Sequence, residues 1–363
     1  MHNRKKAAEI CYDYGMKIIL CHNSALEYWR LHGNKGLHGE IRQRRRNLPA
    51  GPPDTSDIRG KLPSGLSCPV NLLVGSPNAR RSTKLVRPRV YAGLTPDDCF
   101  VSLGADVTVS APAFCFFQMA GELPLVKLIE LGCELCGSYS IAVRSPAVNS
   151  PTVSPPAIGP PATRGGSADG TKTADRNVYD HAPLTNTKAL KAFVDKMEGI
   201  GGQKKARSAL RHIADGSASP METILFMLLT LPQRLGGYGL PAPALNKQIE
   251  LGTAAKQRSG KAYYVCDLFW PEANLAVEYD SDTFHTGAAR ITDDSKKRLH
   301  LAAHGVHAIS VTGTQIRNVT EFESLARLIA EKLGKELRYK NPRFPKARRE
   351  LRDLLLPLPL PFV

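Results

Sequence analysis

The chain has 363 residues, of which 42% are hydrophobic, and is therefore long enough for two domains that each bury a core. Its 49 Lys and Arg residues outnumber its 33 Asp and Glu residues, which gives a net charge of +16. This excess favours a protein that binds a polyanion such as nucleic acid over a protein whose charge only keeps it soluble. The apolar runs are too short to cross a bilayer, and the basic N-terminus lacks the apolar core of a secretory signal. The eight cysteines are irregularly spaced, unlike those of a disulfide-rich protein. We therefore expect a cytoplasmic protein.

The first part of the chain predicts an α+β domain over residues 1–140. Residues 1–46 begin with helix-like sequence and pass into the basic cluster IRQRRR, and the Pro-, Gly- and Asp-rich residues 47–66 are typical of a loop. Short β-rich runs occupy residues 71–109. Residues 113–136 place apolar side chains three and four positions apart, which predicts a helix.

A change of composition then predicts a linker over residues 141–180. The sequence SPAVNSPTVSPPAIGPPATRGGSADGTKTADRN is rich in Pro, Ser, Gly and Thr and has few large apolar residues. Such a segment cannot bury enough surface to fold, so we interpret it as flexible and extended. A second domain is expected over residues 181–340, followed by a basic and Pro-rich tail over residues 341–363. The last ten residues of this tail, LLLPLPLPFV, are expected to be extended.

The second domain predicts an α/β core with a mixed central sheet flanked by helices. A Gly- and Pro-rich loop is expected over residues 232–246. Helices are predicted at 186–198, 202–214, 220–231, 290–304 and 321–337, and strands near 247–251, 262–270, 274–280 and 306–312. The resulting order of helix, antiparallel strands, helix, strand and helix is the basis of the α/β assignment.

An acid cluster lies in the stretch CDLFWPEANLAVEYDSDTFH, residues 266–285. Asp267 lies on the first predicted strand, WPEANL is typical of a hairpin connection, and Glu278 and Asp280 lie two apart on the second strand, so they share a face. Asp267 and Glu278 are thus expected side by side. Adjacent carboxylates repel unless a cation joins them, which predicts a site for Mg²⁺ or Mn²⁺. The alternative is a set of solvated acids at a strand end, and we interpret Asp282 in that way.

This stretch, followed by DSKKRLHLAAHG and VHAISVT, resembles the nuclease fold of the PD-(D/E)xK superfamily, and most of all its very-short-patch-repair-like endonucleases. The resemblance covers residues 219–335 and implies a restriction-endonuclease-like core. By position it implies that Asp267 and Glu278 are the two metal-binding acids. Asp280 stands where the superfamily usually has a lysine, as it does in the repair-like branch, and Ser281 replaces the usual Gly.

The same resemblance implies roles for three further side chains. His285 matches a nearby histidine that acts as a general acid or base or positions water, and its alternative is an ordinary loop histidine. Lys297 and Arg298 match basic helix positions that stabilise charge developing on a phosphate or bind the DNA backbone. Their alternative is charge on a solvated helix surface.

Glu222 has two interpretations of equal weight. The superfamily often carries an acid on the helix before the strands, which is where Glu222 lies. However, SPME, residues 219–222, is also a capping box, with Ser219 at the cap, Pro220 in the first turn and Glu222 reaching back.

The N-terminal part is similar to proteins of the AbiEi type, which are abortive-infection antitoxins and regulators. The resemblance is carried by CHNSALEYWR, SPNARRSTKLVRPRVYAG and DVTVSAPAFCFFQMAGELPLVKLIELGCEL. Only about 20 residues precede CHNSAL, too few for the winged helix with which such proteins often begin.

Three functions are compatible with these residues. The first is a metal-dependent DNA endonuclease of repair or of phage and plasmid defence. The second is a catalytically silent DNA-binding regulator or antitoxin-like protein that uses a nuclease fold, with a cognate toxin or a repair or defence protein as partner. The third is a scaffold for a protein partner. One chain offers one active site, so cleavage of both strands would require a homodimer or two events.

Overall fold

A computed structural model describes residues 18–33, 48–143, 177–250, 262–280, 288–339 and 341–356, except residues 59, 80, 94, 97 and 105. Most of the predicted linker, residues 144–176, and the Pro-rich end, residues 357–363, lie outside the described residues. The chain forms two compact units, Met1–Cys115 and Phe116–Val363. Among the described residues, no helix combines the length and apolar character that crossing a bilayer requires.

The first unit contains a mixed five-stranded sheet with the strand order β3-β2-β1-β5-β4. Its strands are β1 (Ile18–Leu20), β2 (Val70–Val74), β3 (Val86–Val90), β4 (Phe100–Ser102) and β5 (Val107–Ser110). The pairs β1–β5 and β2–β3 are parallel, and β1–β2 and β4–β5 are antiparallel. The short β1 lies where the sequence resembled a helix, because its three residues are fully buried between β2 and β5.

Helix α1 (His22–His32) is anchored to the sheet of the first unit by Trp29. The Trp29 side chain is fully buried, and its indole N–H donates a hydrogen bond of 2.9 Å to the carbonyl oxygen of Ser110 at the end of β5. Two short helical segments, α2 (Thr55–Ile58) and η2 (Pro77–Ala79), lie in the connections between strands.

Helix α3 (Pro112–Glu122) leads from the first unit into the second, and α4 (Leu125–Leu135) follows it. We predicted one helix over residues 113–136, but it is broken at Pro124, which cannot donate the backbone hydrogen bond of a helix interior. The N-terminal domain over residues 1–140 stays a prediction. The second compact unit begins at Phe116, and within it α4 packs against α6 and α7 farther along the chain.

Three helices precede the second sheet: α5 (Thr187–Lys196), α6 (Gln203–Leu210) and α7 (Pro220–Thr230), followed by the short η3 (Gln233–Leu235). Helix α4 approaches the end of α6 closely at Gly132. A Cβ atom at Gly132 would lie only 2.2 Å from Cδ1 of Ile213, so a larger residue there would force the Ile213 side chain to move.

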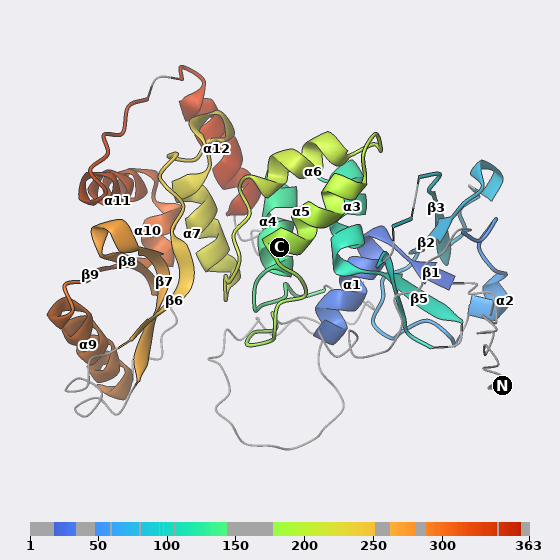
Figure 1. The fold of residues 1–363 in the computed structure, drawn as a ribbon, viewed down its shortest axis with the longest axis horizontal. Helices are drawn as coiled ribbons and strands as arrows, with labels where there is room; N and C mark the ends of the chain where they lie inside the picture. Colours follow the sequence, from blue (N-terminus) through green and yellow to red (C-terminus); the bar gives the residue numbers. More distant parts are fainter. Residues whose placement is uncertain are drawn as a thin grey trace, which may run out of the picture. The chain divides into compact units, whose positions relative to one another are not determined.

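The second sheet has the order β6-β7-β8-β9, and Figure 1 shows it between α7 on one side and α9 on the other. Its elements are β6 (Ala244–Glu250), β7 (Tyr263–Trp270), η4 (Pro271–Ala273), β8 (Leu275–Asp280), α9 (Ala288–Ala303) and β9 (His307–Thr312). The first three strands are antiparallel, and β9 runs parallel to β8. The predicted hairpin between β7 and β8 is present, and the α/β class with mixed sheets is confirmed.

The basic part of the predicted C-terminal tail, for which no secondary structure was predicted, is helical. After α10 (Gly313–Arg317) and α11 (Val319–Lys332), residues within the predicted tail form α12 (Phe344–Leu355). The side chains of Phe344, Leu351 and Leu355 are buried, and α12 packs against η3. Their spacing of seven and four residues is that of an amphipathic helix, so a periodic apolar face outweighed the basic composition of the segment.

Candidate active site

Asp267 lies on β7 where the pairing with β8 ends, one residue beyond the pair Leu268–Val277. Its Oδ2 accepts a hydrogen bond of 2.8 Å from the backbone N–H of Tyr279. Burial, and after it the nearby carboxylates of Glu278 and Glu222, raise the pKa of Asp267 from 3.8 to about 7. Its acidity is thus set by a low-polarity environment that it shares with two other acids.

Glu278 on β8 is paired with Lys297 of α9. The Lys297 Nζ lies 2.6 Å from Glu278 Oε2, and the two side chains are 23% and 17% exposed. Lys297 can reach the acid because α9 connects β8 to its parallel neighbour β9. The other carboxylate oxygen of Glu278, Oε1, is buried and accepts no hydrogen bond from any residue that the structure describes. One oxygen is therefore neutralised and the other has unused coordination capacity.

Glu222 serves the helix start and also lies beside the two strand acids. The Ser219 hydroxyl accepts a hydrogen bond of 3.1 Å from the Glu222 N–H, as a helix cap does. The Glu222 carboxylate reaches back to the N–H of Ala218 at 2.9 Å, one residue before the position of a standard capping box. Burial is the main cause that raises the pKa of Glu222, and the charge of Glu278 adds to it.

Asn246 holds the Glu222 carboxylate in place. It lies in β6 with a backbone φ of 47°, in the left-handed region that side chains other than glycine seldom adopt. Its side-chain amide donates to Glu222 Oε2 at 2.6 Å and to the Gly216 carbonyl at 2.9 Å. Sequence analysis missed Asn246, because nothing in the surrounding ALNKQIE marks a strand asparagine that binds a helix cap.

The remaining predicted side chains are less closely associated. Asp280 is exposed at the end of β8, opposite Thr312 of β9, and Arg298 is exposed on α9. His285 and Asp282 lie outside the described residues. The structure therefore brings together Asp267, Glu278, Glu222 and Lys297, and leaves Asp280 and Arg298 at the surface.

Chemically, the site combines three carboxylates and one ammonium group in a partly buried position. Such a set can bind a hard cation through its oxygens and can place positive charge near an anionic substrate. In the described part of the chain, no group of three or more His, Cys, Asp or Glu side chains is arranged as a ready-made metal centre.

Comparison with known proteins adds no relative from which function could be transferred. No family model, curated protein or solved structure matches the chain. The functional assignment therefore rests on the geometry of the acid cluster formed by Asp267, Glu278 and Glu222, together with Lys297.

Proposed function

We propose that the protein is a divalent-metal-dependent DNA endonuclease that hydrolyses phosphodiester bonds. The observation that carries this proposal is the position of Lys297, whose ammonium group lies 2.6 Å from Glu278 beside the half-buried side chain of Asp267. An ion pair that serves only stability would need a single carboxylate beside Lys297. Here three acids lie near one lysine, and such an excess of buried carboxylates is costly unless a cation or a proton offsets it.

The donor set fits Mg²⁺ or Mn²⁺, with Asp267 and Glu278 as the residues that would hold the ion. Glu278 Oε1 is buried without a donor from the described residues, and Asp267 has a pKa raised to about 7. Both features are expected where a hard cation replaces a proton or a hydrogen-bond donor. A bound ion would supply an activated water and Lewis-acid stabilisation of the phosphate.

The chain's own groups would orient the substrate and hold charge around it. Lys297 would pair with Glu278 and add positive charge next to the scissile phosphate. Asn246 would fix Glu222, and Asp280 would complete or orient the site from the end of β8. His285 would transfer a proton or position water, and Arg298 would bind the DNA backbone.

We further propose a restriction-endonuclease-like core for residues 219–335. Support comes from the order of elements: α7 with Glu222, the antiparallel strands β6 to β8 with Asp267 and Glu278, then α9 with Lys297 and the parallel strand β9. This order agrees with the one that the PD-(D/E)xK resemblance implies.

The second candidate is a catalytically silent DNA-binding regulator. It is favoured by the ion pair itself, since Lys297 already occupies one oxygen of Glu278, and by the lack of a three-ligand group among the described residues. A site that had lost its metal could retain this lysine as a permanent replacement for the cation.

Cleavage of supercoiled plasmid distinguishes the two functions. The full chain is incubated with Mg²⁺, Mn²⁺ or EDTA, beside Asp267→Asn, Glu278→Gln and the control Glu272→Gln, an exposed acid in the turn of the same hairpin. For an endonuclease we expect metal-dependent nicking that falls at least about 100-fold in both site variants and is unchanged in the control. Absence of cleavage, with metal-independent DNA binding, would reject the endonuclease in favour of the regulator.

A further inference from the structure

We propose that the helical hairpin formed by α5, its connecting loop and α6, residues 187–211, is the surface on which this unit binds the phosphate backbone of DNA. The inference rests on the proposed function because it assumes that the ligand is DNA. It places the contact with the DNA backbone at a surface outside the acid cluster. We call this segment the basic hairpin.

The basic hairpin has a strong excess of positive charge. It contains two acids, Asp195 and Glu198, and seven cations: Lys188, Lys191, Lys196, Lys204, Lys205, Arg207 and Arg211. All seven except Lys205, which is half-buried, are exposed. Clustered cations of this kind attract a polyanion, because each phosphate that they contact releases condensed counterions.

Most of this charge is not neutralised by acids of the residues that the structure describes. Asp195 is shared between Lys191 at 3.4 Å and Arg207 at 3.3 Å, and these cations remain 73% and 47% exposed. No carboxylate of a described residue forms a salt bridge with Lys188, Lys196, Lys204 or Arg211. The basic hairpin therefore has cations available for an external anion.

Three arginines of α11 and α12 in the same unit are instead used within the protein. On α11, Arg327 pairs with Glu323 at 2.9 Å, and on α12 Arg348 pairs with the same acid at 2.7 Å. Arg352 of α12 is buried and donates to the carbonyl oxygen of Arg317 at 2.7 Å. An ordinary solvated face usually mixes charges of both signs in this manner, and the basic hairpin does not.

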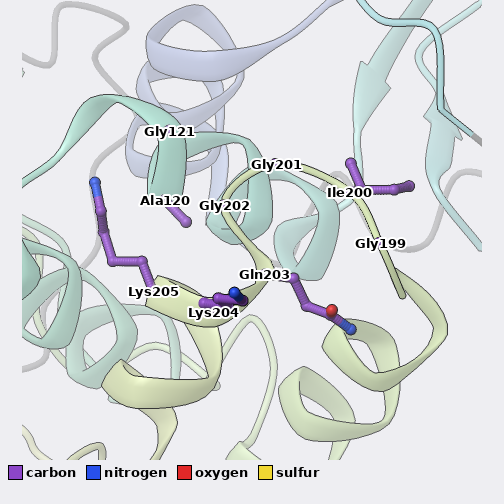
Figure 2. A pocket seen from close by; sticks show the side chains of 9 residues that line it. All are labelled: Ala120, Gly121, Gly199, Ile200, Gly201, Gly202, Gln203, Lys204 and Lys205. Carbon is purple, nitrogen blue, oxygen red and sulfur yellow. The ribbon is translucent and has the colours of Figure 1, made fainter.

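The loop of the basic hairpin also borders an open hollow of about 510 Å³ that could receive a phosphate group. Figure 2 shows Gly199–Gly202 along this hollow, with Lys204 and Lys205 following on α6. A Cβ atom at Gly201 would meet no other atom within 4 Å, so the backbone there is open to a ligand. Lys205 Nζ is held by the Leu123 carbonyl at 2.9 Å, which keeps one cation at a fixed position beside the loop.

The basic hairpin is connected to the acid cluster through short, well-packed segments. Beyond α6, the chain reaches Gly216, whose carbonyl accepts from the same Asn246 amide that holds Glu222. Helix α4 packs against both α6 and α7. DNA held by its backbone on the basic hairpin would thus be bound by the same unit that carries the acids.

Binding of a fluorescent DNA duplex to the full chain, measured by anisotropy in EDTA at several KCl concentrations, tests the proposal. The test variant is Lys188→Glu, Lys204→Glu and Arg211→Glu combined. The control variant is Lys332→Glu, Lys335→Glu and Arg349→Glu combined, which reverses the same number of exposed cations outside the basic hairpin. Both variants have the same net charge, so diffuse attraction falls equally and only location differs.

We expect the basic-hairpin variant to lose at least about 30-fold in affinity, with a slope of log K against log salt that is smaller by about 2–3, and the control to lose less than about 3-fold. The single variants Gly201→Glu and Gly201→Ala repeat the test within the hollow: Glu is expected to weaken binding about 10-fold and Ala to leave it unchanged. This pair decides the matter if the triple variant does not fold.

Equal losses in the two triple variants, or equal affinities of the Gly201 pair, would overturn the proposal. An unmodified chain that binds no DNA at low salt would also overturn it. The outcome is separable from that of the proposed function, because binding in EDTA needs neither metal nor cleavage.

Discussion

At the residue level, Asp267 responds to pH more strongly than an ordinary aspartate would. Burial, and after it the charges of Glu278 and Glu222, raise its pKa to about 7, and the hydrogen bond from the N–H of Tyr279 opposes this rise. Near neutral pH the site is therefore close to the point where a proton or a metal ion competes for the same oxygen atoms.

We predict that Asp267→Asn stabilises the metal-free protein more at about pH 8 than at about pH 5. The raised pKa means that the folded state retains a proton that the unfolded chain has released, so this stabilisation is complete below the unfolded pKa of 3.8 and is lost as the pH rises through about 7. The gain from the variant should differ by about 1–3 kcal/mol between the two pH values. Urea unfolding in EDTA measures it.

Glu272→Gln, which removes an exposed acid from the same hairpin, is the control and should change the free energy of unfolding by less than about 0.5 kcal/mol at either pH. A gain for Asp267→Asn that is the same at both pH values would show that this carboxyl group titrates normally.

At the element level, α12 is a helix that the sequence did not lead us to predict. Its sequence FPKARRELRDLL is basic, and the expectation of an extended chain covered only its last two residues and the prolines beyond them. The helix is stable because its apolar side packs against η3 and α7, and only the fold brings those elements to it. Helix α12 and η3 approach each other closely at Gly236, the residue that ends η3.

We predict that Gly236→Ala costs at least about 3 kcal/mol of stability. Its φ is +91°, and a Cβ atom there would lie 2.2 Å from the backbone oxygen of Ala347 in α12. The control is Gly239→Ala, because Gly239 has a φ of +69° but open space around its Cβ position, and we expect a cost of only about 1 kcal/mol there. Equal shifts of the urea midpoint in both variants would mean that α12 is not packed at this place.

At the level of the whole molecule, the chain contains two separate cores. Leu72 on β2 and Leu268 on β7 are both buried, but they belong to different units and different sheets. Each unit has its own buried core, as a domain able to unfold separately requires.

We predict that scanning calorimetry of the full chain resolves two unfolding transitions. Leu72→Ala should lower the midpoint of one and Leu268→Ala that of the other, because each removes about 2–5 kcal/mol from a single core. A single unfolding transition would contradict this prediction. Two transitions whose midpoints both shift in either variant would contradict it as well.

Part of the candidate site could be predicted from local sequence. The alternation in YYVCDLFW and LAVEYD and the turn WPEANL specify the β7–β8 hairpin, and its register places Asp267 and Glu278 in adjacent positions. Glu222 could be recognised as a cap from SPME, and Lys297 as a basic helix residue. For these residues, the pattern that determines their geometry lies within a few positions of them.

The contacts between these elements could not be predicted in the same way. That Lys297 pairs with Glu278, that Asn246 binds Glu222, and that α4 and α12 pack with the second unit all depend on segments far apart in the chain. The sequence by itself determined the net charge, the α/β class and the acid hairpin, because those follow from composition and short-range periodicity. Only the tertiary structure decided which charges are neutralised and which face outward, because burial and pairing are properties of the packed chain.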